Sequence, residues 1–239
     1  MFGTLKKIFK ALSGPQINKK NPLHGQQLKE VLISSMYASQ QSAYLNSYET
    51  GLDRSLRWEI LRNWWSITDR QSAIETLSYL LHSGYLDLFQ TVLKAFRDQS
   101  GNYAEIIDNE AEDEEDYERM VNMYRNLKTS FPQFLEDKII SDDRELEKIG
   151  IAAWDFGRGV FIARRCWEES FISREEMTEY LESCYNELRK YCDTWTDYTK
   201  SYMLGRGMWN ADSANSGMTA IAEELMTHDK SPLKGGGPI

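Results

Sequence analysis

The sequence predicts an all-α fold, a globular bundle of many helices. Apolar residues recur at spacings of three and four along most of the 239-residue chain, which places them on one face of successive helices. No sustained alternation of apolar and polar residues predicts a strand. Two capping-box signatures, Ser173 with Glu176 and Thr194 with Asp197, mark where two of the helices begin.

Composition narrows the class of protein. With 41% hydrophobic residues the chain can bury a core, and its length fits one large domain or two small lobes. The formal net charge of -9 argues against binding to nucleic acid, which a basic surface usually drives. The three cysteines include no CxxC pair and the three histidines are far apart, so we expect no disulfide framework, no metal site and no cofactor. No apolar run approaches the length of a membrane span, and a cytoplasmic protein is expected.

Residues 1–24 are predicted to be a separate basic amphipathic segment. Within Phe2–Leu12 the apolar residues fall on one side of a helix and the lysines on the other. Such a segment packs on the body of its own protein, or makes a weak peripheral contact with an anionic surface such as the inner membrane. The sequence leaves both interpretations open.

The middle of the chain, residues 25–210, is predicted to be the helical domain. Helical spacing runs through residues 25–48, 52–65 and 86–97, and Thr68 with Gln71 predicts the cap of a helix that ends at Gly84. The acidic stretch 108–116 is the best candidate for a mobile linker between lobes 25–107 and 117–210. A helix from residue 117 is expected to end or change direction at Pro132.

The C-terminal part shows clearer signals. Residues 142–169 predict one long helix, and capped helices follow from Ser173 and Thr194. Within residues 211–239 we expect a short helix at 218–226. Its Gly- and Pro-rich tail from His228 onward is predicted to be disordered.

Charged residues interrupt two of these apolar helix faces. Helical counting places Asp155 and Arg158 on one face with Ile151 and Ile162. By the same count Arg206 shares a face with four aromatic residues, namely Trp195, Tyr198, Tyr202 and Trp209. Stranding one partner of a buried ion pair costs on the order of 3–5 kcal/mol. These charges therefore mark either a buried structural network or a ligand site.

The segments that carry these charges resemble a known family. Trp65–Arg70 reads Trp-Ser-Ile-Thr-Asp-Arg, Ala153–Arg158 reads Ala-Trp-Asp-Phe-Gly-Arg, and Gly205–Trp209 reads Gly-Arg-Gly-Met-Trp. In this order they are similar to the motifs of the bacterial domain-of-unknown-function 1266 family, over about residues 28–210. The resemblance implies a bacterial, mostly helical, cytoplasmic protein, and it carries no established activity.

The charged motif residues have two interpretations. In the first, Asp155 and Arg158 pair along one helix, Asp69 or Arg206 completes an ion-pair cluster, and the tryptophans form the core around it. In the second, arginines gather an anionic ligand and Asp69 or Asp155 acts as base or orienter. The candidate binding residues are Asp69, Arg70, Asp155, Arg158, Arg164, Arg206, Trp65, Trp195, Tyr202 and Trp209.

Two classes of function follow. No nucleophile motif, glycine-rich phosphate loop or metal-binding motif is recognised in the sequence. We therefore expect an interaction protein, either an adaptor or regulator or a toxin-neutralising module, whose acidic surface meets a protein partner. The alternative is an enzyme or small-molecule binder that uses the Arg/Asp cluster on an anionic ligand, a phosphate or a carboxylate. Whether the chain is an enzyme stays open.

Overall fold

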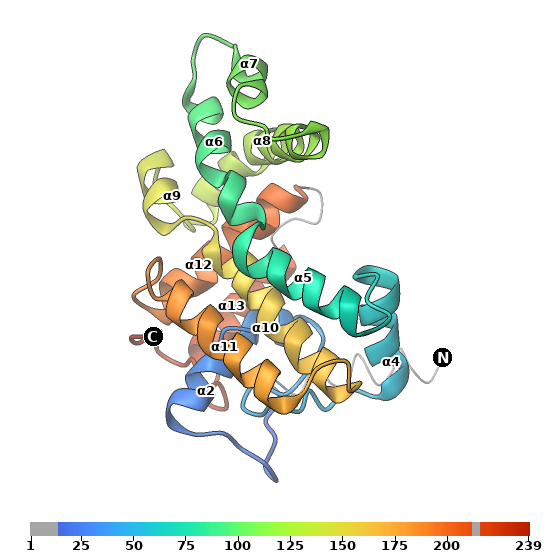
Figure 1. Ribbon diagram of the computed structural model, residues 1–239. Helices are drawn as coiled ribbons and strands as arrows, with labels where there is room; N and C mark the ends of the chain where they lie inside the picture. Colours follow the sequence, from blue (N-terminus) through green and yellow to red (C-terminus); the bar gives the residue numbers. More distant parts are fainter. Residues whose placement is uncertain (1–13, 212–215) are drawn as a thin grey trace, which may run out of the picture.

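The computed structural model describes residues 14–211 and 216–239 and confirms the all-α fold (Figure 1). The predicted amphipathic segment Phe2–Leu12 lies outside the described residues. In chain order the helices are α2 (Gly25–Leu32), α3 (Ser35–Gln40), α4 (Arg54–Trp58), the π-helix η1 (Glu59–Trp64), α5 (Arg70–His82), α6 (Tyr85–Arg97), α7 (Tyr103–Asp108), α8 (Glu114–Glu136), α9 (Asp143–Ile149), α10 (Ala152–Glu168), α11 (Arg174–Leu188), α12 (Trp195–Trp209) and α13 (Ser216–Thr227). Over the described part of the chain, no helix is both long and apolar enough to cross a membrane.

Helix α10 is the centre of the fold. Every residue from Ala152 to Cys166 is buried, because α5, α6, α11 and α12 pack around this helix (Figure 1). A helix that is covered on all sides cannot be amphipathic, and its polar side chains must find partners inside the protein. The two charged residues predicted on one face, Asp155 and Arg158, lie in this buried helix.

The core does not divide at the acidic stretch 108–116. Helix α6, before the stretch, packs against α8, after it, and one hydrophobic cluster contains residues from both sides. The stretch itself holds the end of α7, a turn, and the first turn of α8, where the Asp113 carboxylate accepts a hydrogen bond from the Asp116 N–H at 2.9 Å. The predicted lobes 25–107 and 117–210 therefore share a core.

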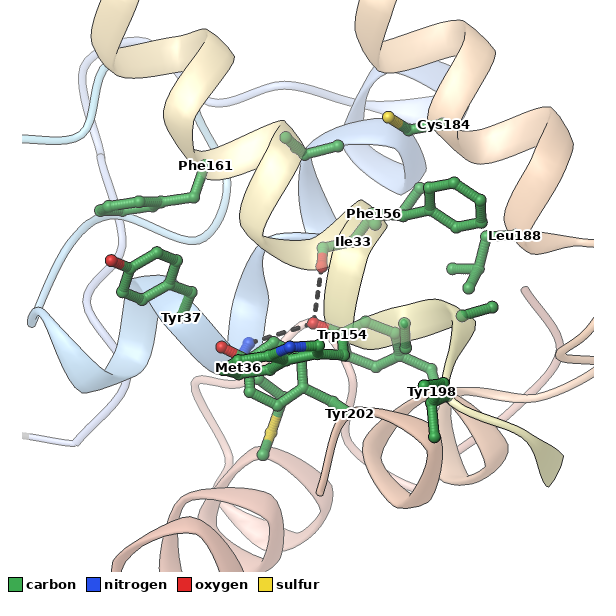
Figure 2. Packing of buried hydrophobic residues seen from close by; sticks show 14 of the residues in the cluster. Ile33, Met36, Tyr37, Trp154, Phe156, Phe161, Cys184, Leu188, Tyr198 and Tyr202 are labelled. Carbon is green, nitrogen blue, oxygen red and sulfur yellow. Dashed lines mark hydrogen bonds between the residues drawn. The ribbon is translucent and has the colours of Figure 1, made fainter. Parts of the chain in front are cut away.

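A tyrosine from α12 holds the N-terminal helices in place. The Tyr198 hydroxyl donates a hydrogen bond to the Ile33 carbonyl at 2.6 Å and accepts one from the Met36 N–H at 3.1 Å. Figure 2 shows both bonds, with Tyr198 reaching from α12 to the turn between α2 and α3. The turn thereby gains partners for backbone groups that no helix satisfies, and α3 is fixed beside α10.

Asp155 caps a helix other than its own. Helix α6 begins after Gly84, which has no side chain to cap it. The Asp155 carboxylate takes over that role from the middle of α10 and accepts a hydrogen bond from the Leu86 N–H at 2.7 Å. A carboxylate at a helix N-terminus satisfies free N–H groups and is favoured by the helix dipole. The contact joins α6 to α10.

Helix boundaries differ from the prediction at several points. The cap of α5 is Asp69 with Ser72, not Thr68 with Gln71, because the Asp69 carboxylate accepts the Ser72 N–H at 2.9 Å. The predicted helix 142–169 is broken into α9 and α10 at Gly150, whose φ of 60° is left-handed. The capping boxes of α11 and α12, at Ser173 and Thr194, are confirmed.

Helix α8 continues through Pro132 instead of ending at this residue. A proline in a helix removes one backbone hydrogen bond and disfavours the helical conformation of the residue before it. Here residues on both sides of the proline, Leu127 and Phe134, are buried in the core. We infer that this tertiary packing offsets the local penalty.

The C-terminal tail is ordered, contrary to the prediction of disorder. Its backbone pairs with the segment before α12, where the Ile239 N–H donates to the Asp193 carbonyl at 3.1 Å and the Trp195 N–H donates to the Gly237 carbonyl at 3.0 Å. Leu233 and Ile239 are buried. Glycine and proline content predicted a flexible tail, but two apolar side chains and a backbone bridge hold it on the core.

The contact between Asp155 and the N-terminus of α6 can be tested by a substitution at Gly84. A Cβ added at Gly84 would lie 2.6 Å from the Asp155 carboxyl carbon, so Gly84→Ala should displace this carboxylate and lower the melting temperature. Backbone strain cannot explain a loss, because the φ of Gly84 is -78°. The matched control is Gly217→Ala in α13, where nothing lies within 4 Å of the added Cβ. Equal melting temperatures of the two variants would contradict the conclusion that the Asp155 carboxylate stabilises the N-terminus of α6.

Candidate functional site

All three predicted motif regions contribute to a pocket beside α10. The cavity has a volume of about 460 Å³ and is lined by aromatic, arginine and glutamine side chains. We call it the aromatic pocket; its lining residues are Tyr37, Gln40, Gln41, Trp64, Trp65, Trp154, Arg158, Tyr202, Arg206 and Trp209. These residues come from α3, the end of η1, α10 and α12.

Helix α12 supplies one wall of the pocket. Tyr202, Arg206 and Trp209 follow at spacings of four and three and so share a helix face. This face runs from the core to the surface, since Tyr202 is buried and Trp209 is 43% exposed. The predicted aromatic face of α12 therefore becomes a pocket wall only in its last two turns.

The opposite wall comes from a distorted segment. Trp64 ends η1 and Trp65 follows it, and Ser66 has a left-handed φ of 55°. Irregular π turns and strained backbone are both found more often at functional sites than elsewhere. The Trp65 indole N–H donates to the Tyr37 hydroxyl at 3.1 Å, which fixes the inner tryptophan, while Trp64 at the rim is 50% exposed.

Arg158 is a buried, neutralised charge at the back of the pocket. Its Nη2 forms an ion pair with Asp155, and its Nε donates to the Trp154 carbonyl at 3.0 Å. The guanidinium lies 4.1 Å from the centre of the Trp154 ring. Burial raises the pKa of Asp155, and the Arg158 charge opposes this shift. The pair predicted from the sequence is therefore present, and the Asp155 carboxylate is engaged by Arg158 and by the Leu86 N–H.

Arg206 differs from Arg158 because its charge is not neutralised. The Nη1 atom is buried without a hydrogen-bond partner among the described residues, and no described carboxylate forms an ion pair with this side chain. Its guanidinium lies 4.4 Å from the centre of the Trp209 ring. Burial lowers the pKa of Arg206, and the nearby Arg158 charge lowers it further.

A second donor in the pocket also lacks a partner. The Trp154 indole Nε1 is buried without a hydrogen bond to any described residue. Indole and guanidinium groups can only donate hydrogen bonds, and a buried donor without an acceptor costs about 1–3 kcal/mol. Trp154 and Arg206 together therefore call for an acceptor, which the described protein does not provide.

Three arginine side chains act on the hydroxyl of Tyr37 at the pocket wall. Burial raises the pKa of the Tyr37 hydroxyl, and three guanidinium groups, those of Arg158, Arg165 and Arg206, act in the opposite direction. Arg165 is fully buried, and its three guanidinium nitrogens have no hydrogen-bond partner among the described residues. Burial lowers the pKa of Arg165 to about 10. Only Arg158 of these three has an ion-pair partner in the described structure.

Besides Asp155, which lies behind Arg158 and does not line the pocket, four predicted candidates lie outside it. Asp69 caps α5, and the exposed Arg70 pairs with Glu176 of α11 through two bonds at 2.9 and 2.5 Å. Trp195 is buried in the first turn of α12 and contacts Tyr198, with ring centres 5.6 Å apart. Asp69 therefore does not complete the network of Asp155 and Arg158, as one interpretation expected.

Arg164, the fourth, is a structural residue. Its guanidinium donates to the Tyr44 carbonyl at 2.7 Å, the Ser47 carbonyl at 2.8 Å and the Ser34 hydroxyl at 2.9 Å. Burial lowers its pKa to about 10. The side chain thus holds the loop that follows α3, and it has no surface on which a ligand could bind.

Half of the residues that line the aromatic pocket were not predicted from the sequence. Tyr37, Gln40 and Gln41 carry no motif signal, because they reach the pocket only through the packing of α3 on α10. Trp64 and Trp154 were expected to be core residues. Trp154 is buried but lines the pocket, whereas Trp64 is half exposed at the surface. The adjacent tryptophans Trp64 and Trp65 were the one sequence feature that could have indicated Trp64 as a pocket residue.

A larger hollow of about 840 Å³ lies on the other side of Asp155, between the α5–α6 turn and α11. None of its lining side chains carries a buried polar atom that lacks a partner. The aromatic pocket, whose lining includes two such atoms, is therefore the stronger candidate site. Within residues 14–211 and 216–239, no group of three His, Cys, Asp or Glu residues could hold a metal ion.

The cysteines do not supply a nucleophile to either hollow. Cys166, Cys184 and Cys192 are buried, and burial raises the pKa of each thiol to about 12. Reactivity depends on the thiolate form, so these side chains act as small apolar core residues.

Fold and site together define an all-α protein with a half-open pocket of arginine and tryptophan. The chain belongs to the family described as "Protein of unknown function (DUF1266)", whose profile matches residues 60–235. The predicted family is thereby confirmed, and the matched region includes every pocket residue except those from the α3 segment. No curated protein and no solved structure matches the chain.

The two pocket arginines should respond differently to removal of their charge. Arg158→Met leaves Asp155 buried without its ion-pair partner, which costs roughly 3–5 kcal/mol, and a chain of this size loses roughly 2–4 °C in melting temperature per kcal/mol. Arg206→Met removes an unpaired buried charge, and its melting temperature should stay within about 2 °C of wild type or rise. Thermal unfolding followed by circular dichroism measures both. An equal, large drop for the two variants would show that Arg206 is structural.

Proposed function

We propose that this protein binds a small organic anion that carries a flat unsaturated ring, in the aromatic pocket. The observation that carries the proposal is the pair of buried donors without acceptors, Arg206 Nη1 and Trp154 Nε1. An anionic group in the pocket would offset the unpaired charge of Arg206 and offer an acceptor to its guanidinium, and hydrogen bonds to charged groups contribute about 1.5–3 kcal/mol each. A planar guanidinium suits carboxylate and phosphate oxygens alike.

The aromatic walls support the ring part of the ligand. Trp64 and Trp209 stand at the rim, 50% and 43% exposed, and leaving two indoles in water loses apolar burial. Aromatic pairs gain about 0.5–1.5 kcal/mol beyond the area they bury. The volume of about 460 Å³ falls in the usual range of small-molecule sites, roughly 300–1,000 Å³.

A protein partner is the second candidate. Tryptophan and arginine are the residue types most concentrated at the energetic centres of protein interfaces, and Trp64, Trp209 and Arg206 lie together here. An adaptor, regulatory or toxin-neutralising role would then use this surface to receive a carboxylate of the partner. For both candidates we propose that the protein acts in the bacterial cytoplasm, as the motif resemblance implies. A weak contact of Phe2–Leu12 with the membrane is an additional proposal.

Ligand titrations followed by tryptophan fluorescence test the first candidate. The probes are phenyl phosphate and indole-3-acetate, each beside a neutral analogue of similar shape, benzyl alcohol and indole-3-ethanol. We expect saturable binding of the anions, at least about tenfold tighter than the neutral analogues, and a loss of at least about tenfold in Arg206→Met. The matched control is Arg125→Met, which removes an exposed arginine of α8 outside the pocket.

Two results would overturn the small-ligand proposal: anions binding no better than neutral analogues, or Arg206→Met binding them like wild type. The protein-partner candidate has a separate measurement. A partner co-purified with wild-type protein should be lost with Trp64→Ala and Trp209→Ala and kept with Ile74→Ala, another exposed apolar residue. Retention by the tryptophan variants would exclude this surface.

A further inference from the structure

Arg206 and Gln40 line a second cavity as well as the aromatic pocket. This cavity has a volume of about 570 Å³ and lies between α3, α12 and α13. We call it the α13 cavity; Ser39, Met218, Ile221 and Glu224 contribute to its lining. The unpaired guanidinium therefore stands at the junction of two hollows, not at the end of one.

The position of the charge restricts the shape of a ligand that fills both hollows. Such a ligand has its anionic group in the middle, beside Arg206, with a substituent on each side. A carboxylate has a single substituent and can only branch from a chain, whereas a phosphodiester keeps a negative charge while it links two groups directly. The geometry favours a bridging phosphate over a terminal acid.

The α13 cavity has the mixed chemistry of a sugar or base site. Met218 and Ile221 offer apolar surface, and the Glu224 carboxylate can accept hydrogen bonds from hydroxyl or amino groups. The Ser39 hydroxyl is buried there without a hydrogen-bond partner among the described residues. Ser39 belongs to the wall of the α13 cavity and Trp154 to the wall of the aromatic pocket, and Arg206 lines both.

We propose that the ligand is a two-part phosphodiester of the dinucleotide class. One flat base occupies the aromatic pocket between Trp64 and Trp209, the bridging phosphate binds Arg206, and the second nucleoside lies in the α13 cavity. Bases stack on aromatic side chains with about 1–3 kcal/mol each. This inference rests on the proposed function and names the ligand class for the same site.

The experiment compares a whole dinucleotide with its parts on the full-length protein. Adenylyl-(3′→5′)-adenosine, adenosine 5′-monophosphate and adenosine are titrated by calorimetry and by tryptophan fluorescence. We expect the dinucleotide to bind at least tenfold tighter than the monophosphate, and adenosine to bind most weakly. Arg206→Met should weaken both phosphorylated probes.

A cavity-filling variant separates the two hollows. Ala220 is exposed on α13 and lines the α13 cavity, so Ala220→Trp should fill it from the surface without disturbing the core. The dinucleotide should then lose at least tenfold in affinity and fall to the level of the monophosphate, whose binding stays unchanged. Glu223→Trp, on the same helix but outside the cavity, is the matched control and should bind like wild type. Melting temperatures of both variants confirm folding.

The outcomes distinguish the two proposals. If phenyl phosphate and the monophosphate bind through Arg206 but the dinucleotide binds no tighter, the two-part ligand is overturned and the anion pocket stands. If the dinucleotide binds tighter and Ala220→Trp leaves its affinity unchanged, the second nucleoside does not use the α13 cavity, and the inference fails. If no anion binds, the proposed function fails with it.

Discussion

The buried carboxylate of Asp155 is the contact on which the arrangement of the central helices depends. It caps the N-terminus of α6 through the Leu86 N–H and pairs with Arg158 on its own helix. Burying a carboxylate is unfavourable unless hydrogen bonds and an opposite charge compensate it. Both are present here. One side chain therefore sets the position of α6 on α10 and holds a guanidinium at the back of the aromatic pocket.

From this contact the structure leads directly to the candidate site. The Arg158 guanidinium lies 4.1 Å from the centre of the Trp154 ring, and that of Arg206 lies 5.8 Å from it. The Trp154 indole thus lies near two arginines: Arg158, whose charge is neutralised by Asp155, and Arg206, which has no ion-pair partner among the described residues. A cation beside an aromatic face is stabilised by about 0.5–2 kcal/mol, which offsets only part of the penalty of a buried, unpaired guanidinium. A bound anion would supply the rest.

Arginines selected by the same reasoning have four different roles. Arg70 forms an exposed ion pair, Arg164 is buried among backbone carbonyls, Arg158 is paired with a carboxylate, and Arg206 faces a cavity. Residue type and helical spacing are the same kind of signal for all of them. Their roles differ because each meets different neighbours from elsewhere in the chain. The structure therefore gives each of these arginines its own environment, and only Arg158 and Arg206 line the aromatic pocket.

By itself the sequence determined the features that depend on neighbouring residues. Helical spacing identified the all-α fold, the capping boxes located the starts of α11 and α12, and the spacing of three predicted the pair of Asp155 with Arg158. Such signals act within about one turn of helix, so they need no knowledge of distant contacts. Local rules also produced the errors at Pro132 and in the tail, where packing overrides propensity.

Tertiary structure alone decided which residues form the site. The approach of α3 brings Tyr37 and Gln40 to the tryptophans of η1 and α12, and the placement of α13 opens a second cavity at Arg206. Tyr37 and Gln40 are separated by more than a hundred positions from the residues of α12 that they meet, and no periodic pattern encodes such a meeting. Only the packed fold shows which buried donors find acceptors and which do not, because that depends on every element around them.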